Sequence, residues 1–263
     1  MNTTDWNTNL SAAAAKALQC LDLTSLNDAD TEADIARLCQ RAQGPHGHVA
    51  AVCVWPRLAA FARAQLPASI AVAAVANFPD GSTDIERAVR DTAEIVQAGA
   101  QEVDVVLPWR QLLSGDREGP AQLLRAVRKA CESLTLKVIM ETGELREEAA
   151  IALACRISLD CGADFLKTST GKTATSATPQ AARVVLNAIA HDAALRDRVG
   201  FKPSGGIRTV ADAASYLWLT QEILGPQALT PQRFRIGASS VLTDIEALLS
   251  GSSPASAAAP GSY

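Results

Sequence analysis

Short apolar runs rich in β-branched residues alternate along the chain with longer segments whose apolar residues have helical spacing. Segments 83–98 and 146–161, for example, collect their apolar residues on one side of a helix. Strands that alternate with helices pair in parallel through crossover connections, so the pattern predicts an α/β fold. The predicted strands are 20–24, 49–54, 70–76, 102–107, 136–141, 165–167, 199–202 and 234–237.

Eight such β/α units favour closure into a (β/α)8 TIM barrel, with an open doubly wound sheet as the alternative. Local signals mark several helix ends. Pro179 should begin one helix in its first turn, and Thr209 or Asp212 should begin a later one. Gly99 and Gly162 each stand between a helical segment and a strand, where a left-handed residue commonly ends a helix.

The length of 263 residues suits a single barrel domain, which we place at residues 1–249. Segment 5–16 predicts an extra N-terminal helix at the bottom of the barrel. Segment 250–263 has the low-complexity sequence SGSSPASAAAPGSY, which is typical of a flexible C-terminal tail. That tail nevertheless ends in a tyrosine, Tyr263.

Composition narrows the range of partners. The formal net charge is −4 and no run of lysine and arginine forms a basic face, so we expect no nucleic-acid partner. No apolar stretch reaches the roughly 20 residues of a membrane span, and the N-terminal segment lacks a secretory signal pattern. We therefore expect a cytoplasmic protein without a membrane partner. A homodimer is compatible with the sequence, which leaves the oligomeric state open.

The cysteine and histidine residues give little sign of a metal site. None of the six cysteines forms a C-x-x-C pair, and several lie in apolar runs, so free buried thiols are expected rather than disulfides or zinc ligands. His46 and His48 lie in a Gly/Pro turn without a neighbouring carboxylate, which favours a surface loop. The cysteines are Cys20, Cys39, Cys53, Cys131, Cys155 and Cys161.

Charged residues interrupt five of the predicted strands, on the face that should meet the barrel interior. Alternation along each strand gives their direction, because successive side chains point to opposite faces. The bland interpretation is a structural ion-pair network, for example Lys137 with Glu141 or Asp22. The inward polar residues are Asp22, Thr24, Glu102, Asp104, Lys137, Glu141, Lys167 and Lys202.

Lys167 and Lys202 favour a chemical role, because both lie at the carboxyl end of a strand, where barrels place their catalytic groups. A lysine becomes a nucleophile only as the neutral amine. Lowering its pKa from ~10.4 to ~7 takes roughly 4–5 kcal/mol. Two ammonium groups ~4 Å apart repel by about 4 kcal/mol at an effective dielectric constant near 20, so a second lysine suffices. The pair predicts Schiff-base chemistry, with Asp104 able to move protons.

Three small Gly/Ser-rich loops follow the last three predicted strands. They occupy 168–173, 203–209 and 237–240. Such loops present backbone N–H groups and a helix N-terminus to an anion, and barrels often hold phosphate after strands seven and eight. Gly171-Lys172-Thr173 is similar to the end of a P-loop, but Leu166 stands where that motif needs glycine, which argues against nucleotide binding.

Taken together, these segments resemble the deoxyribose-phosphate aldolase family over nearly the whole chain, from about residue 20 to residue 263. GADFLKTSTGK and GFKPSGGIRT are the most specific matches, because each holds a lysine in an extended context. The other matching segments are LDLTSLN, VCVWP, NFPDG, EVDVVLP, KVIMETGEL, RIGASS and the terminal Ser-Tyr. The departures are Trp55, where many members have tyrosine, and Ser204, where many have alanine.

The resemblance implies a reversible retro-aldol cleavage of 2-deoxy-D-ribose 5-phosphate to D-glyceraldehyde 3-phosphate and acetaldehyde, without metal or cofactor. By resemblance, Lys167 forms the imine, Lys202 lowers its pKa, Asp104 relays protons, and Tyr263 assists proton transfer at the acetaldehyde carbon. The expected partners are therefore a phosphosugar and acetaldehyde. The substrate-binding residues expected are Thr24, Thr170, Gly171, Lys172, Gly205, Gly206, Arg208, Gly237, Ser239 and Ser240.

Two other functions compete with this one. Another Schiff-base barrel enzyme, such as a transaldolase or a hexose bisphosphate aldolase, would place its lysine in a different local sequence. A barrel that only binds a phosphosugar would not need an inward pair such as Lys167 and Lys202. Trapping an adduct with acetaldehyde and borohydride separates a Schiff-base enzyme from a binder.

Overall fold

The computed structural model describes residues 4–251, which contain a parallel eight-stranded sheet in the order β10-β1-β4-β5-β6-β7-β8-β9. Each predicted strand overlaps one observed strand. The strands are β1 (Leu21–Thr24), β4 (Ala51–Val54), β5 (Ala71–Ala76), β6 (Glu102–Val106), β7 (Thr135–Ile139), β8 (Phe165–Lys167), β9 (Gly200–Lys202) and β10 (Ile236–Ala238).

Backbone contacts between β9 and β10 close the sheet into a barrel. Phe201 pairs with Phe234 and Ser204 with Gly237, both in the parallel sense. The amide of Arg235 donates to the Phe201 carbonyl at 3.0 Å. β10 in turn pairs with β1, so the ring is complete. The predicted (β/α)8 barrel is confirmed, and the alternative of an open doubly wound sheet is wrong.

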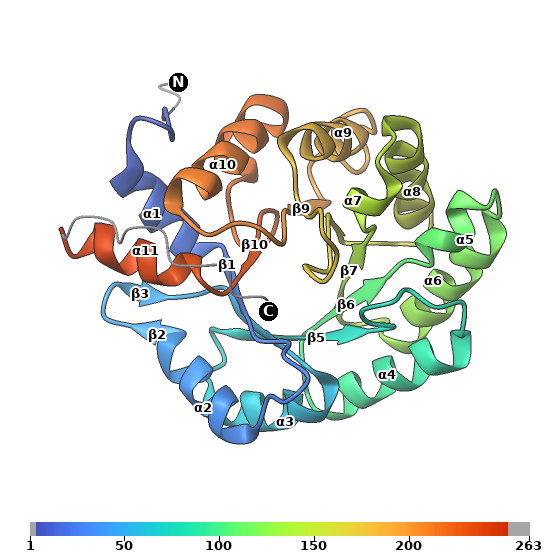
Figure 1. Cartoon of the computed structure of the whole chain (residues 1–263), viewed down its shortest axis with the longest axis horizontal. Helices are drawn as coiled ribbons and strands as arrows, with labels where there is room; N and C mark the ends of the chain where they lie inside the picture. Colours follow the sequence, from blue (N-terminus) through green and yellow to red (C-terminus); the bar gives the residue numbers. More distant parts are fainter. Residues whose placement is uncertain (1–3, 252–263) are drawn as a thin grey trace.

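The helices surround this ring of strands, as Figure 1 shows in a view along the barrel. A short hairpin, β2 (Gln43–Gly44) with β3 (Gly47–His48), carries both His46 and His48 near the surface. The helices are α1 (Leu10–Gln19), α2 (Glu32–Arg41), α3 (Pro56–Gln65), α4 (Ile85–Gln97), α5 (Trp109–Leu113), α6 (Glu118–Ala130), α7 (Thr142–Leu145), α8 (Glu148–Asp160), α9 (Pro179–Ala190), α10 (Val210–Leu224), the 3-10 helix η1 (Pro226–Ala228) and α11 (Val241–Leu249).

Helix ends follow the local sequence signals. Pro179 begins α9, and Thr209 caps α10 through a capping box in which its side chain and that of Asp212 each accept the other residue's backbone N–H. Gly99 and Gly162 follow α4 and α8 with φ of 72° and 84°. These are left-handed values that glycine adopts without a steric cost, so both predicted helix stops are confirmed.

The extra N-terminal helix is present, but the predicted bounds of 5–16 are wrong. Helix α1 begins after Asn9, whose side chain accepts the amide of Ala12 and so fixes the first turn. The helix packs against α10 and α11, and Lys16 Nζ donates to the Leu229 carbonyl in the loop that leads into the last strand. That contact places α1 beside the amino ends of the strands. Most of the predicted tail, 252–263, lies outside the described residues.

Apolar residues from strands and helices make one continuous core around the barrel. Val103 and Val105 of β6 are fully buried on the side away from the barrel interior, as strand alternation predicts. All six cysteines are buried and unpaired, so the predicted free thiols are confirmed. Within residues 4–251, every helix is too short or too polar to cross a membrane.

Candidate active site

Asp104, in the middle of β6, stands at the centre of a buried charged cluster inside the barrel. Its Oδ2 atom accepts Lys167 Nζ at 2.8 Å and Lys202 Nζ at 2.7 Å, and its Oδ1 atom accepts Lys137 Nζ at 2.7 Å. β8 and β9 pair in register, so Lys167 and Lys202 lie directly opposite each other. The prediction that Lys167 and Lys202 point into the barrel side by side is therefore confirmed.

Below this level the interior is closed by a second set of ion pairs. Lys137 Nζ lies 2.5 Å from Glu102 Oε2 and 3.7 Å from Asp22 Oδ2. Arg235 contacts both carboxylates, with Nη1 2.6 Å from Asp22 Oδ1 and Nη2 2.6 Å from Glu102 Oε1. Lys202 also donates to Asp22. The bland interpretation is thus partly correct, because Lys137 does sit in a structural ion-pair network that includes Asp22.

Sequence reasoning missed Arg235. It precedes β10, and its neighbours Phe234 and Ile236 are fully buried while it turns inward between them. The alternation in the segment FRIG carries that signal, because strand periodicity puts Arg235 on the face opposite both neighbours. An inward arginine just before the last strand completes the set of charges at the bottom of the barrel.

The pairing of Lys137 with Glu141 is wrong. Glu141 comes after the end of β7 in a left-handed conformation, with φ 55°, which turns its side chain away from the row that Lys137 occupies. Its carboxylate accepts the Thr170 hydroxyl at 2.5 Å and the Thr170 amide at 3.3 Å. Burial raises the pKa of Glu141, although the hydrogen bonds from Thr170 and Thr173 act against that rise. Glu141 therefore anchors the loop that follows Lys167.

Burial lowers the pKa of Lys167, and Lys202 lowers it further, while Asp104 acts in the opposite direction. The sequence predicts the second lysine as a sufficient cause, but removal from water is the larger one, since the Lys167 side chain is only 2% exposed. The result has the predicted direction. Lys167 holds a proton less firmly than an ordinary lysine and is suited to act as an amine nucleophile.

Lys202 and Lys137 show the opposite behaviour in the same interior. Burial alone would lower the pKa of Lys202, but Asp104 and Asp22 raise it well above its ordinary value. Asp104 and Glu102 likewise raise the pKa of Lys137, although burial alone would lower it. Burial would raise the pKa of Asp104, but the three lysines hold it well below the usual range. Asp104, Lys137 and Lys202 therefore remain charged at neutral pH, and Lys167 is the member that can become neutral.

The three predicted anion-binding loops meet at the carboxyl end of the barrel. The Thr168 hydroxyl donates to the Ser204 carbonyl at 3.2 Å, and the Gly205 amide donates to the Gly237 carbonyl at 3.3 Å. A Cβ atom on Gly205 would come within 3.1 Å of the Gly171 Cα atom. A Cβ atom on Gly237 would lie 3.1 Å from the Lys202 Cε atom. Glycine at these positions allows the loops to pack closely beside the lysine pair.

The remaining predicted binding residues differ in what they contact. The Thr24 hydroxyl donates to the Asp22 carbonyl, and Lys172 Nζ donates to the Leu26 carbonyl at 2.8 Å. Arg208 is exposed, and its amide donates to Asp212. Gly206 has φ 78° and is exposed beside Gly205; Ser239 and Ser240 precede α11, with Ser240 at its N-cap. Tyr263 lies outside the described residues.

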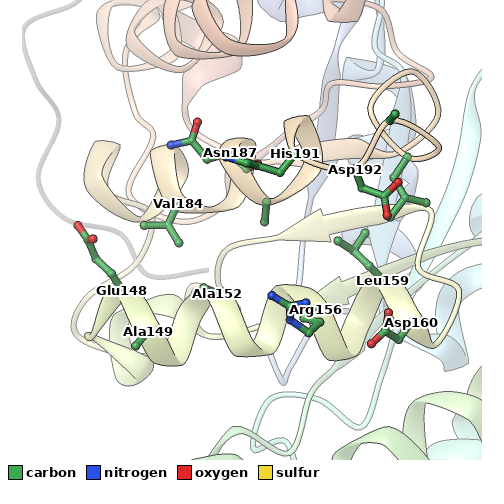
Figure 2. Close-up of a pocket in the computed structure, with 13 residues that line it drawn as sticks. Glu148, Ala149, Ala152, Arg156, Leu159, Asp160, Val184, Asn187, His191 and Asp192 are labelled. Atoms are coloured by element: carbon green, nitrogen blue, oxygen red, sulfur yellow. The ribbon is translucent and has the colours of Figure 1, made fainter.

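A separate groove of about 880 Å³ lies on the outer surface between α8 and α9 (Figure 2). Ala152 and Val184 line its wall, with Arg156 and His191 among its polar residues. Its lining comes from these two helices and the segment after α9, so it contains none of the inward charged side chains. Among residues 4–251, no group of three or more His, Cys, Asp or Glu residues is arranged to hold a metal ion.

Comparisons with known proteins agree with this geometry. The family model described as DeoC/LacD family aldolase matches residues 16–249. A deoxyribose-phosphate aldolase of Agrobacterium fabrum (strain C58) is 47% identical over 249 residues, covering 94% of this chain and 95% of that protein.

Solved structures support the fold. A crystal structure described as a deoxyribose-phosphate aldolase from Toxoplasma gondii ME49 aligns with a TM-score of 0.84 at 24% identity, over 94% of this chain and 98% of that one. One from Coccidioides immitis aligns with a TM-score of 0.76 at 26% identity, with the same coverage. The family resemblance inferred from the segments around the two lysines is confirmed, and the chain belongs to the DeoC/LacD family of aldolases.

Proposed function

We propose that this aldolase cleaves 2-deoxy-D-ribose 5-phosphate reversibly into D-glyceraldehyde 3-phosphate and acetaldehyde, with Lys167 as the imine-forming residue. The observation that carries the proposal is the position of Lys167. It lies at the carboxyl end of β8, is buried, and has its pKa lowered beside a second lysine on the same Asp104 oxygen. The name of the relative from Agrobacterium fabrum supports the choice of substrate.

The reaction begins when neutral Lys167 attacks the aldehyde carbon of the open-chain sugar. The carbinolamine loses water to give a protonated imine, and that cation draws electrons from the C2–C3 bond. Loss of the C3 hydroxyl proton then breaks the bond and releases D-glyceraldehyde 3-phosphate. The enamine that remains takes a proton at C2, and water releases acetaldehyde from Lys167. Asp104, 2.8 Å from Lys167 Nζ, moves protons to and from the carbinolamine oxygen.

The loops at the mouth of the barrel bind the 5-phosphate in this proposal. Their contacts with one another bring three Gly/Ser-rich turns to one place, and Ser240 begins a nine-residue helix whose N-terminus favours an anion. Lys172 and Arg208 add positive charge at the rim. The binding set is Thr24, Thr170, Gly171, Lys172, Gly205, Gly206, Arg208, Gly237, Ser239 and Ser240.

One experiment tests the chemistry. The protein is treated with acetaldehyde and sodium borohydride, digested, and mapped by mass. The proposal predicts a reduced adduct on Lys167. An adduct on Lys202 or Lys137 would show that the residue assignment is wrong, and the absence of any adduct would favour a barrel that only binds phosphosugars. Comparing turnover of 2-deoxyribose 5-phosphate with that of hexose bisphosphates tests the substrate.

We also propose that residues 1–249 form the catalytic barrel and that the tail 250–263 brings Tyr263 to its mouth. A Gly/Ser/Ala-rich tether supplies the phenol at high effective concentration. Tyr263→Phe should slow deuterium exchange of the acetaldehyde methyl protons by on the order of 10²-fold, the scale of a positioned general base. Imine formation on Lys167 should survive. The six unpaired cysteines support a reducing cytoplasm as the compartment.

A further inference from the structure

Arg235 and Glu102 form a buried ion pair at the bottom of the barrel that the proposed chemistry does not use. Two nitrogens of Arg235 contact Glu102, at 2.6 and 3.1 Å, and the guanidinium lies 5.7 Å from the Phe165 ring. A continuous series of contacts leads from this pair to the reactive amine. Glu102 contacts Lys137, Lys137 contacts Asp104, and Asp104 contacts Lys167.

The charges in this series do not balance. The cluster holds four basic and three acidic side chains in direct contact: Lys137, Lys167, Lys202 and Arg235 with Asp22, Glu102 and Asp104. An enclosed group with one unit of excess charge is costly, and the loss of one proton removes the excess. Arginine does not give up its proton in proteins, so a lysine must do so.

The number of carboxylate partners decides which lysine loses its proton. Lys137 contacts three carboxylates and Lys202 contacts two, whereas Lys167 contacts Asp104 alone among the described residues. The proton on Lys167 is therefore the least stabilised. Arg235 contributes to this order of proton loss through the carboxylates that it contacts. It occupies one oxygen of Asp22 and contacts both oxygens of Glu102, and its charge makes the total exceed that of the carboxylates.

We propose that the Arg235–Glu102 pair is a positioning pair that sets the protonation of Lys167 through the charge count of the buried ion-pair cluster. The proposal rests on the proposed role of Lys167 as the imine-forming residue. The fixed positive charge of Arg235 gives the cluster one more positive charge than its carboxylates balance, so one lysine proton is in excess. The negative charge of Glu102 keeps that excess at a single proton. Both residues are buried, so solvent screens their charges weakly.

Other groups face these residues and enter the same balance. Arg235 faces Asp22 of β1, the Cys20 thiol before it, and the Phe165 ring of β8. Lys167 faces Asp104, Lys202 and the Cys53 thiol of β4, and Glu141 lies within electrostatic range. Burial raises the pKa of both thiols, so they stay neutral at the pH of the reaction. Glu141 lies outside the ion-pair cluster, because its carboxylate accepts the Thr170 and Thr173 hydroxyls in the loop after Lys167, and burial raises its pKa. The charges in direct contact with one another are therefore those of the cluster alone.

A purely structural pair and a charge-setting pair predict different results for two single substitutions. A structural pair would be broken by R235M and by E102Q alike, and both would damage the site in the same way. A charge-setting pair gives opposite signs. R235M removes the surplus positive charge, which lets Lys167 keep its proton to a higher pH. E102Q removes a negative charge, which increases the surplus and makes Lys167 lose its proton at a lower pH.

The test measures the pH midpoint of borohydride-trapped imine formation with acetaldehyde in the full-length protein. We expect a midpoint about one pH unit higher in R235M and lower by a similar amount in E102Q, on the order expected for one buried unit charge. R235K keeps the charge and should stay near the wild-type midpoint. The double variant R235M/E102Q removes both charges and should return toward it.

Circular dichroism and thermal melting accompany each variant. Shifts of the same sign in R235M and E102Q, or unchanged midpoints in folded variants, would overturn the proposal. If R235M fails to fold, E102Q and the double variant decide by the same midpoints. An adduct that maps away from Lys167 in the wild-type protein would instead defeat the proposed residue assignment, so the two failures are distinguishable.

Discussion

The bottom of the barrel interior (the floor) and its carboxyl end (the mouth) contain the same chemical groups, but these groups have different roles. Lys137 at the floor and Lys167 at the mouth are both buried, and both donate to Asp104. Lys137 has two further carboxylates and its pKa is raised, whereas the pKa of Lys167 is lowered. Burial alone therefore does not make a lysine nucleophilic. The number of negative partners decides whether the ammonium or the amine is the stable form.

The two regions also differ in how the backbone encloses them. At the floor, the side chains of Glu102 and Arg235 point inward, and their ion pairs close the interior. At the mouth, Gly205 and Gly237 allow the loops that carry them to contact each other closely. This division matches the general rule that barrels place function at the carboxyl end of the strands and stability at the amino end.

Exchanging each lysine for methionine should separate these regions most sharply. Lys167→Met should lower kcat by roughly 10⁴-fold or more, since the covalent path is lost, and should leave the melting temperature nearly unchanged. Lys137→Met should destabilise the fold by about 3–5 kcal/mol, because it leaves buried carboxylates short of a partner. Urea unfolding and initial rates on the same samples check both. Equal losses of stability in the two variants would remove the distinction.

Lys202 tests how much of the mouth's reactivity comes from a neighbouring charge. Lys202→Leu removes a positive charge beside Lys167, so the pKa of Lys167 should rise. Imine formation needs the neutral amine, and the rate at pH 7 should fall on the order of 10³-fold and recover as the pH is raised. The full pH profile of acetaldehyde trapping measures this. A profile parallel to that of the wild type would mean that burial alone lowers the pKa of Lys167.

Much of this arrangement could be predicted from the sequence. Strand alternation placed Asp104, Lys167 and Lys202 on the inner face, because the side-chain period of a strand is fixed whatever surrounds it. The glycine and proline signals at helix ends depend on local backbone sterics, and these held as well.

Other features depend on tertiary contacts that no local pattern contains. Arg235 lies just before a short strand with a weak pattern, and its partners Asp22 and Glu102 are far from it in the sequence. In the sequence pattern, Glu141 continues the alternation of β7. In the structure, the backbone turns at that residue and its carboxylate binds Thr170. Burial as the main cause of the shift at Lys167 likewise requires the closed barrel.

Asp104 belongs to both regions, since one of its oxygens binds Lys137 and the other binds the two lysines at the mouth. Asp104→Asn should lower kcat by on the order of 10²-fold if the carboxylate relays protons. Because Asp104 raises the pKa of Lys167, its loss should also move imine trapping to lower pH. Rates per folded molecule, corrected by thermal melting, decide. Wild-type kcat in a poorly folding variant would mean that Asp104 only holds the lysines in place.

The smallest effect concerns the mouth alone, where charge should matter only for a charged substrate. Ser239 lies in the loop between β10 and α11, and Ser240 is the N-cap of that helix. Ser239→Glu places a negative charge where the phosphate is proposed to bind, so KM for 2-deoxyribose 5-phosphate should rise at least ~10-fold. KM for unphosphorylated deoxyribose should change little, since that sugar has no charge to repel. Ser250→Glu, at the far end of the same helix, is the matched control. Equal changes in KM for both sugars would place the phosphate elsewhere on the barrel.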